Sequence, residues 1–273
     1  RVGGRPGRPA SRDEPLHIAH RQRGSTLAAM GSPTPHSPEA LRRRPIVVVN
    51  PNASDAVTRR IEASVAPLSS EREPVRCVTL DEGPPAIESH EDFERAIPCV
   101  ERFVRAEAEA AAFVVACFSD PGVPEARRCT DRPVVGIQEA SVALALTLGG
   151  TFGIVALVEA SVERQRRALA AAGLIGRLAG SRPAGLGVAA LEDRATAWPR
   201  IREAARRLSA EDGADVILLG CAGMGAYRAE LEQSVGVPVV DPCQAGVLLA
   251  RAHLRLGLRS RSMPRSALDP AGV

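Results

Sequence analysis

The chain has 273 residues, of which 45% are hydrophobic and 25% charged, and its formal net charge at pH 7 is +3. These values are typical of a globular protein with one large domain or two small ones. All 35 basic residues are arginine, so the chain cannot use a lysine Schiff base or a P-loop lysine. No apolar run approaches the ~18 residues that a membrane-spanning helix requires, so we expect no membrane partner.

Residues 1–44 differ in composition from the rest of the chain. They contain nine arginines and three acidic residues, with many Pro, Gly and Ser, and the remaining residues carry a net negative charge. No apolar segment typical of a signal peptide is present. We predict a disordered basic extension, with Met30 as a candidate start of translation. Nucleic-acid binding by this tail is one alternative, but we predict no nucleic-acid partner for the folded part.

Short apolar runs alternate with helical patterns from Pro45 onward. Such alternation implies βαβ units and parallel sheets. Right-handed crossovers place the loops after the strands on one sheet edge, where ligands bind. The predicted strands are 46–49, 75–80, 112–117, 134–136, 152–157, 184–188, 215–220 and 237–240. The predicted helices are one from a cap at Asn52 or Ser54 to 66, then 98–110, 138–148, 161–173, 198–210, 226–234 and 242–256, with a loop at 81–93.

The strand–helix pattern restarts after residue 148, which predicts an α/β fold of two similar domains with parallel sheets flanked by helices. We assign residues 45–141 plus 241–256 to the first domain and residues 142–240 to the second. Residues 257–273 are rich in Arg, Ser and Pro, and we expect a frayed tail there.

Cys117 and Cys221 each end an apolar run and precede the same kind of segment. AAFVVACFSDPG continues to RPVVGIQEAS, and ADVILLGCAGMG continues to VPVVDPCQAG. Two such units that face each other would place two thiols on opposite sides of one cleft, where a proton could pass between two faces of a carbon. We expect a nearby helix N-terminus to lower each thiol pKa and loop amides to hold a developing oxyanion.

The other candidate bases are few. Only His90 and His253 lie in the expected fold, so base chemistry must fall mostly to carboxylates or thiols. The chain has no C-x-x-C and no zinc-binding spacing, so we expect no metal and, with no signal peptide, free thiols in the cytoplasm. Cys243 follows a strand at the same edge, and its role stays open. We interpret three further cysteines as core residues: Cys77, Cys99 and Cys129.

At these motifs the sequence resembles the hydantoin racemase family, within the aspartate/glutamate racemase superfamily, which includes allantoin racemase. The combination of ACFSDPG with LGCAGM is its most specific part, and the resemblance extends over about residues 45–256. The other matching segments are VVNPNAS, GPPAIESHEDFERAIP, PVVGIQEAS and PVVDP.

The resemblance implies two α/β domains related by a pseudo-twofold axis, with the active site between them. It implies cofactor-independent racemisation of 5-substituted hydantoins or allantoin, small-molecule substrates, and a homo-oligomer. Cys117 and Cys221 match the family's catalytic pair. The segments expected to border or bind the substrate contain Asn50, Phe118, Ser119, Ala222 and Gly223.

Three positions depart from the family pattern, all near strand ends. Gln138 stands where Gly is usual, and 156–158 (Ala-Leu-Val) replaces a Thr-rich turn. Pro242-Cys243 follows the PVVD segment, where Gly is usual.

Two alternatives keep the fold and change the function. One is an amino-acid racemase, or a related decarboxylase or isomerase, which would need charged partners for ammonium and carboxylate. For this first alternative the candidate charged partners are Arg127, Arg128, Glu88 and Asp120. The second alternative is a non-catalytic module that binds a ureide or another small molecule and has lost turnover at the altered loops.

Overall fold

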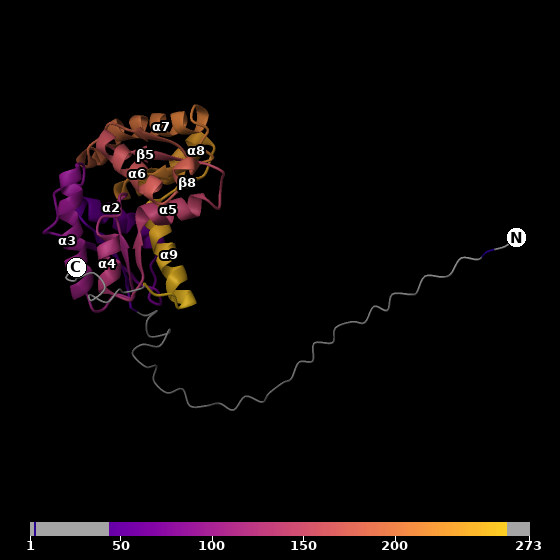
Figure 1. Ribbon diagram of the computed structural model, residues 1–273. Coiled ribbons are helices and arrows are strands. Elements are labelled where there is room, and N and C mark those ends of the chain that lie inside the picture. The colour runs from indigo at the N-terminus through magenta and orange to yellow at the C-terminus, as the bar shows by residue number, and fades with distance from the viewer. Residues whose placement is uncertain (1–2, 4–43, 261–273) are drawn as a thin grey trace, which may run out of the picture. The chain divides into compact units, whose positions relative to one another are not determined.

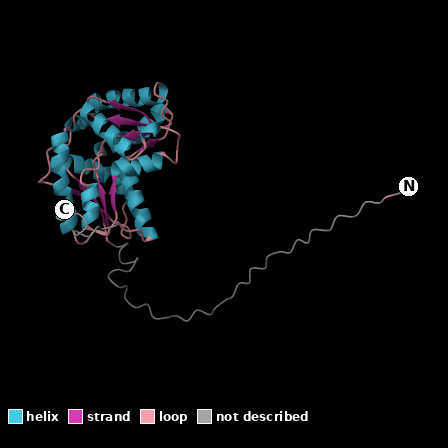
Figure 2. Ribbon diagram, viewed as in Figure 1, coloured by secondary structure: helices cyan, strands magenta, loops and turns pink. Residues whose placement is uncertain are grey.

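The computed structural model describes Gly3 and residues 44–260, and it places two parallel four-stranded sheets in the longer segment. The first sheet has the order β2-β1-β3-β4 and the second β6-β5-β7-β8, so the same strand order occurs twice. The predicted α/β fold class, with two parallel sheets flanked by helices, is therefore confirmed (Figures 1 and 2). The strands are β1 (Ile46–Asn50), β2 (Val75–Thr79), β3 (Ala112–Val115), β4 (Val134–Gly136), β5 (Phe152–Ala156), β6 (Leu178–Pro183), β7 (Val216–Leu219) and β8 (Val239–Val240).

Several helices begin where the sequence supplies a side-chain cap. Ser54 accepts from the Val57 amide, and Asp193 accepts from the Ala195 and Thr196 amides, which satisfies donors that a helix N-terminus leaves open. The helices are α2 (Asp55–Val65), α3 (His90–Ala106), α4 (Val123–Cys129), α5 (Ile137–Ala145), α6 (Glu159–Ala171), α7 (Arg194–Ala210), α8 (Arg228–Val235) and α9 (Pro242–Leu256). The 3₁₀ turns are η1 (Ala66–Leu68), η2 (Ile175–Arg177), η3 (Val188–Glu192) and η4 (Ala222–Tyr227).

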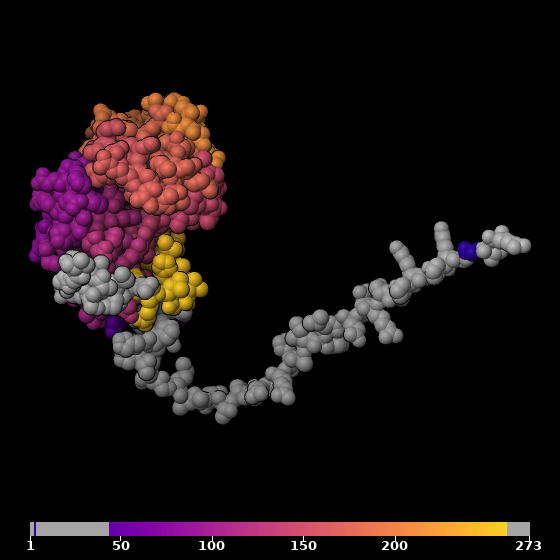
Figure 3. Space-filling model, in the orientation of Figure 1, coloured from indigo at the N-terminus to yellow at the C-terminus, as the bar shows by residue number. Residues whose placement is uncertain are grey.

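One apolar core passes from the first sheet to the second. It contains Val48 and Val114 from the first sheet together with Ile154 and Leu218 from the second, all fully buried. Helix α5 contacts β4, β7 and β8, whereas α9 returns from the second sheet to contact β1, β3 and β4. Figure 3 shows the salmon and orange residues of the second half packed against the purple and magenta residues of the first. The domain boundaries predicted above stay a prediction.

Two element predictions differ clearly from the structure. The second predicted helix, α3, begins at His90 rather than 98, because Ser89 and Asp92 form a capping box there and Pro98 lies inside the helix. The sixth strand is β6 rather than 184–188, because β6 is only partly buried and lacks an apolar run. Helix α4 was not delimited in the sequence. The predictions for the basic extension and for the end of the C-terminal tail fall on residues 1–2, 4–43 and 261–273, which lie outside the described residues.

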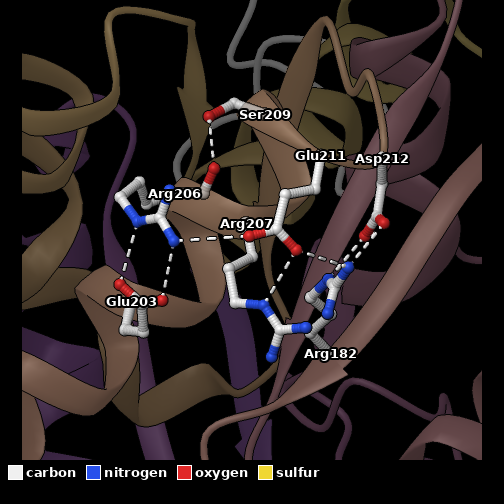
Figure 4. A network of polar contacts seen from close by, with 7 residues as sticks. All are labelled: Arg182, Glu203, Arg206, Arg207, Ser209, Glu211 and Asp212. Carbon is white, nitrogen blue, oxygen red and sulfur yellow. Dashed lines mark hydrogen bonds and ion pairs between the residues drawn. The ribbon is translucent and has the colours of Figure 1, made fainter.

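A network of charges joins β6 to the end of α7 (Figure 4), partly buried at Arg182 and Asp212 and exposed elsewhere. Arg182 donates from Nε and Nη2 to the two carboxylate oxygens of Asp212, at 2.6 and 2.7 Å. Glu211 in turn accepts from Arg206 and Arg207. Exposed ion pairs contribute little each, so this network fixes the position of edge strand β6 more than it stabilises the fold. No helix among the described residues is long and apolar enough to cross a membrane.

The shared core predicts the effect of removing a side chain from it. Ile154→Ala should lower the free energy of unfolding by about 3 kcal/mol, because it leaves a cavity between the sheets. Ile175→Ala, at an exposed side chain, is the matched control and should change it by less than about 0.5 kcal/mol. Urea denaturation followed by circular dichroism measures both. We expect a single transition, and two separate transitions would contradict a core that joins the halves.

Candidate functional site

Cys117 and Cys221 line one pocket between the carboxyl ends of the two sheets. Cys117 lies two residues beyond β3 and Cys221 two residues beyond β7, and each of these strands lies inside its sheet. The pocket contains about 500 Å³ of space free of atoms, part of which is open to solvent. The two residues at the centre of the sequence prediction are therefore brought together, one from each half.

Aliphatic and polar side chains share the walls of the pocket. The aliphatic part comes from Val57 and Ile87 of the first half and from Leu157, Val158 and Val188 of the second. Aliphatic walls lower the local dielectric and strengthen electrostatic interactions beside them.

Burial raises the pKa of both thiols. The pKa of Cys117 rises to about 12, chiefly by burial and then by Cys221 and Asp120. Burial also raises the pKa of Cys221, to about 11, although the Gly223 amide lowers it. The expectation that a helix N-terminus lowers these pKa values is not met. The reason is that burial outweighs the amides beside each thiol, including that of Gly223, which donates to Cys221 at the N-cap of η4.

The loop amides beside the thiols divide into two groups. Ser119 N–H donates to the Cys117 carbonyl at 2.8 Å, and Gly223 N–H donates to Cys221 Sγ at 3.4 Å. The amides of Phe118 and Ala222, directly after each cysteine, have no acceptor among the described residues, and both residues line the pocket. The free donors are thus at equivalent positions of the two halves, whereas Gly223 lies behind Cys221.

Asp120 closes the Cys117 loop onto α5. Its backbone is left-handed, with φ of 50°, a conformation that Asp tolerates better than most residues. Its carboxylate accepts from the amides of Gln138 and Glu139, each at 2.9 Å. A Cβ on Gly136 would lie 2.2 Å from the carboxylate carbon, so only glycine fits there. Burial raises the pKa of Asp120 to about 7, although the two amides lower it.

The second half also has an aspartate that caps a helix and lies against a glycine, but the two residues have exchanged places between the cysteine loop and the end of the last strand. Asp241, at the end of β8, accepts from the amides of Cys243 and Gln244 at 2.8 and 3.2 Å. The glycine is now in the cysteine loop, because a Cβ on Gly225 would lie 2.4 Å from the Asp241 carboxylate. In both halves a carboxylate thus caps the helix that follows the last strand of the sheet and lies against a glycine.

Asn50 does not itself line the pocket. It is 1% exposed, and its amide donates to Asn52 Oδ1 and Thr58 Oγ1, each at 3.0 Å. Asn52 lines the pocket instead. The first-strand motif therefore reaches the site through its second asparagine, with Asn50 as its support.

Two charged residues of the pocket connect the halves, and sequence reasoning missed this role. Glu88 Oε1 accepts from the Val188 amide at 2.7 Å, across 100 residues of sequence. Arg164 of α6 donates to the Glu88 carbonyl at 3.4 Å and to Ser161 Oγ at 3.1 Å. The capping box at Ser89 could have shown that Glu88 lies just before the start of a helix. No local sequence pattern marks Val188, whose amide it binds.

The departures from the family pattern lie in different places. Leu157 and Val158 form part of the pocket wall. Gln138 is buried at the start of α5, and Cys243 lies beneath the Cys221 loop, with Sγ 3.7 Å from the Ala222 carbonyl. His, Cys, Asp and Glu side chains of residues 44–260 form no group suited to a metal ion.

The fold and the pocket define an α/β protein with two repeated parallel sheets and a thiol from each half in the space between them. Residues 46–250 match the model of the Asp/Glu/Hydantoin racemase family. The hydantoin racemase of Paenarthrobacter aurescens is 34% identical over 221 residues, covering 79% of this chain and 93% of the relative. That of Pseudomonas sp. strain NS671 is 36% identical, covering 80% and 89%.

The solved structures agree with this assignment. The allantoin racemase from Klebsiella pneumoniae superimposes with a TM-score of 0.78 at 32% identity, covering 81% of this chain and 94% of that one. The chain belongs to the Asp/Glu/Hydantoin racemase family and is an isomerase of the racemase class.

The contact between Asp120 and Gly136 predicts the effect of one added methyl group. Gly136→Ala should displace the carboxylate, remove the cap of α5 and lower the free energy of unfolding by about 2 kcal/mol. Gly176→Ala is the matched control, because nothing lies within 4 Å of the added Cβ. Thermal unfolding measures both variants. Equal melting temperatures for the two would show that the Asp120 contact does not constrain this position.

Proposed function

We propose that the protein racemises 5-substituted hydantoins or allantoin without a cofactor, by proton transfer between Cys117 and Cys221. The observation that carries this proposal is the presence of both strand-end thiols in one pocket. The names of the similar proteins, hydantoin racemase and allantoin racemase, support the substrate class.

The chemistry begins at a carbon between a ring nitrogen and a carbonyl, whose hydrogen is weakly acidic. One cysteine, as thiolate, removes this hydrogen from one face, and the electron pair passes to the carbonyl oxygen as an enolate. The opposite cysteine, as a neutral thiol, returns a proton to the other face. The free amides of Phe118 and Ala222 are the donors available to the enolate oxygen, each worth about 3 kcal/mol when well placed.

The substrate class rests on the similar proteins more than on the charges of the pocket. A free amino acid carries a fixed ammonium and carboxylate, and Glu88 and Arg164, the charged residues that line the pocket, have the opposite signs. The other candidates are engaged elsewhere, because Arg127 donates to the Val134 carbonyl and Asp120 caps α5. Assays with a hydantoin, allantoin and aspartate, side by side, test the substrate class.

The non-catalytic alternative rests on the altered wall at Leu157 and Val158. It predicts thermal stabilisation by a hydantoin or allantoin without exchange of the carbon-bound hydrogen. Assembly into a homo-oligomer and a cytoplasmic location stay predictions; light scattering in solution tests the first.

Replacement of either pocket thiol should abolish inversion. Cys117→Ala and Cys221→Ala should each reduce kcat/KM by about 10²- to 10⁴-fold, because each removes an acid–base group. Polarimetry of one enantiomer, with NMR detection of deuterium incorporation from heavy water, measures both steps. Cys129→Ala changes a thiol outside the pocket and should keep the wild-type rate. Wild-type rates in both pocket variants would rule out the two-thiol mechanism.

The raised thiol pKa values predict a rate that increases with pH. At neutral pH both thiols are protonated, so the reactive form with one thiolate is a minority. Below about pH 11, the lower of the two values, the thiolate fraction grows tenfold per pH unit. kcat/KM should therefore rise with a logarithmic slope near one between pH 6 and 9. A plateau already reached at pH 7 would contradict this, and would mean that a thiolate exists in the resting enzyme.

A further inference from the structure

Arg164 is a cation without a carboxylate partner. It lines the pocket from α6, and its guanidinium donates only to a hydroxyl and to a carbonyl. The Nε atom is buried and has no acceptor, and no Asp or Glu of the described residues lies within ion-pair distance. Glu88, the nearby acid of the pocket, uses one carboxylate oxygen for the Val188 amide.

A partly buried charge without a counter-ion is costly to maintain. The cost is offset where an anion forms beside it. Glu88 forms no ion pair with Arg164, and the thiols of the pocket are the other groups that can become anions. Cys117 lines the same pocket as Arg164, and the positive charge of Arg164 lowers the Cys117 pKa against the effect of burial. Burial lowers the pKa of Arg164, whereas Cys117 raises it.

Cys221 has an equivalent neighbour from the other half. The stem of Arg60, on α2, lies 3.7 Å from the position of a Cβ on Gly223, and α2 packs against η4, which begins directly after Cys221. The charge of Arg60 lowers the pKa of Cys221. Arg60, like Arg164, has no ion-pair partner among the described residues.

We infer that each thiolate has its counter-ion in the opposite half of the molecule: Arg164 for Cys117 and Arg60 for Cys221. Both arginines are positioning residues that act through a cysteine, and their purpose rests on the proposed racemase function. Three other titratable groups lie around the two thiols. Asp120 raises the pKa of Cys117, and Glu88 raises the pKa of Cys221. The pKa of Cys243 is itself raised, chiefly by burial and also by the two thiols.

The test measures thiol reactivity, which does not depend on turnover. The wild type, Arg164→Met and Arg60→Met are alkylated with iodoacetamide between pH 7 and 10, and mass spectrometry follows Cys117 and Cys221 separately. Arg164→Met should slow alkylation of Cys117 at pH 9 by ~3- to 10-fold, the effect of a pKa increase of about half to one unit, and leave Cys221 unchanged. Arg60→Met should do the reverse. Arg164→Lys keeps the charge and should restore most of the Cys117 reactivity.

The crossed pattern separates an electrostatic role from a structural one. A general loosening of the pocket would change both cysteines together in either variant, and that result, or no change at all, would overturn the inference. If racemisation is absent but the crossed pattern is found, the proposed function fails and the counter-ion assignment stands. With a racemisable substrate, each variant should lower kcat/KM equally for both enantiomers, because the equilibrium constant of racemisation is one.

Discussion

The packing of one apolar core between two sheets is the constraint on which the site depends. The sheets share buried side chains such as Val114 and Leu218, so neither can shift without opening a cavity in a close-packed interior. The loops that follow β3 and β7 are therefore held in a fixed position relative to each other. Two thiols can act on opposite faces of one carbon only if their separation is constant, and the core, rather than the loops, provides that constancy.

The same burial that fixes the thiols also makes them poor bases at neutral pH. An aliphatic pocket penalises a thiolate, and the pKa values of Cys117 and Cys221 rise accordingly. Each half then supplies a free amide after its cysteine and an arginine to its opposite cysteine. In the proposed mechanism these groups would act on charge that exists only during the reaction, which is where stabilisation increases the rate. The raised pKa values favour neutral thiols in the resting protein.

The sequence was sufficient to predict the fold class, the family and the thiol pair, because each depends on local signals. Buried strands are short apolar runs, and a cysteine at the end of such a run is visible without a structure. Asn52 and Arg164 were missed as site residues, and Glu88 was named only as a partner of an amino-acid substrate, because the contacts of Glu88 and Arg164 join distant segments. The edge strand β6 was missed for a related reason: it is half-exposed and paired on one side only, so its composition resembles a loop.

The exchange of carboxylate and glycine between the halves has a consequence for how such a chain can diverge. In the first half Asp120 occupies the space of a side chain on Gly136, and in the second half Asp241 faces Gly225. A single replacement of either glycine creates a steric overlap, and a single loss of either aspartate leaves two helix amides without an acceptor. Conversion of one arrangement into the other therefore requires both positions to change together. Among relatives, a change at one residue of a pair should therefore be accompanied by a change at the other.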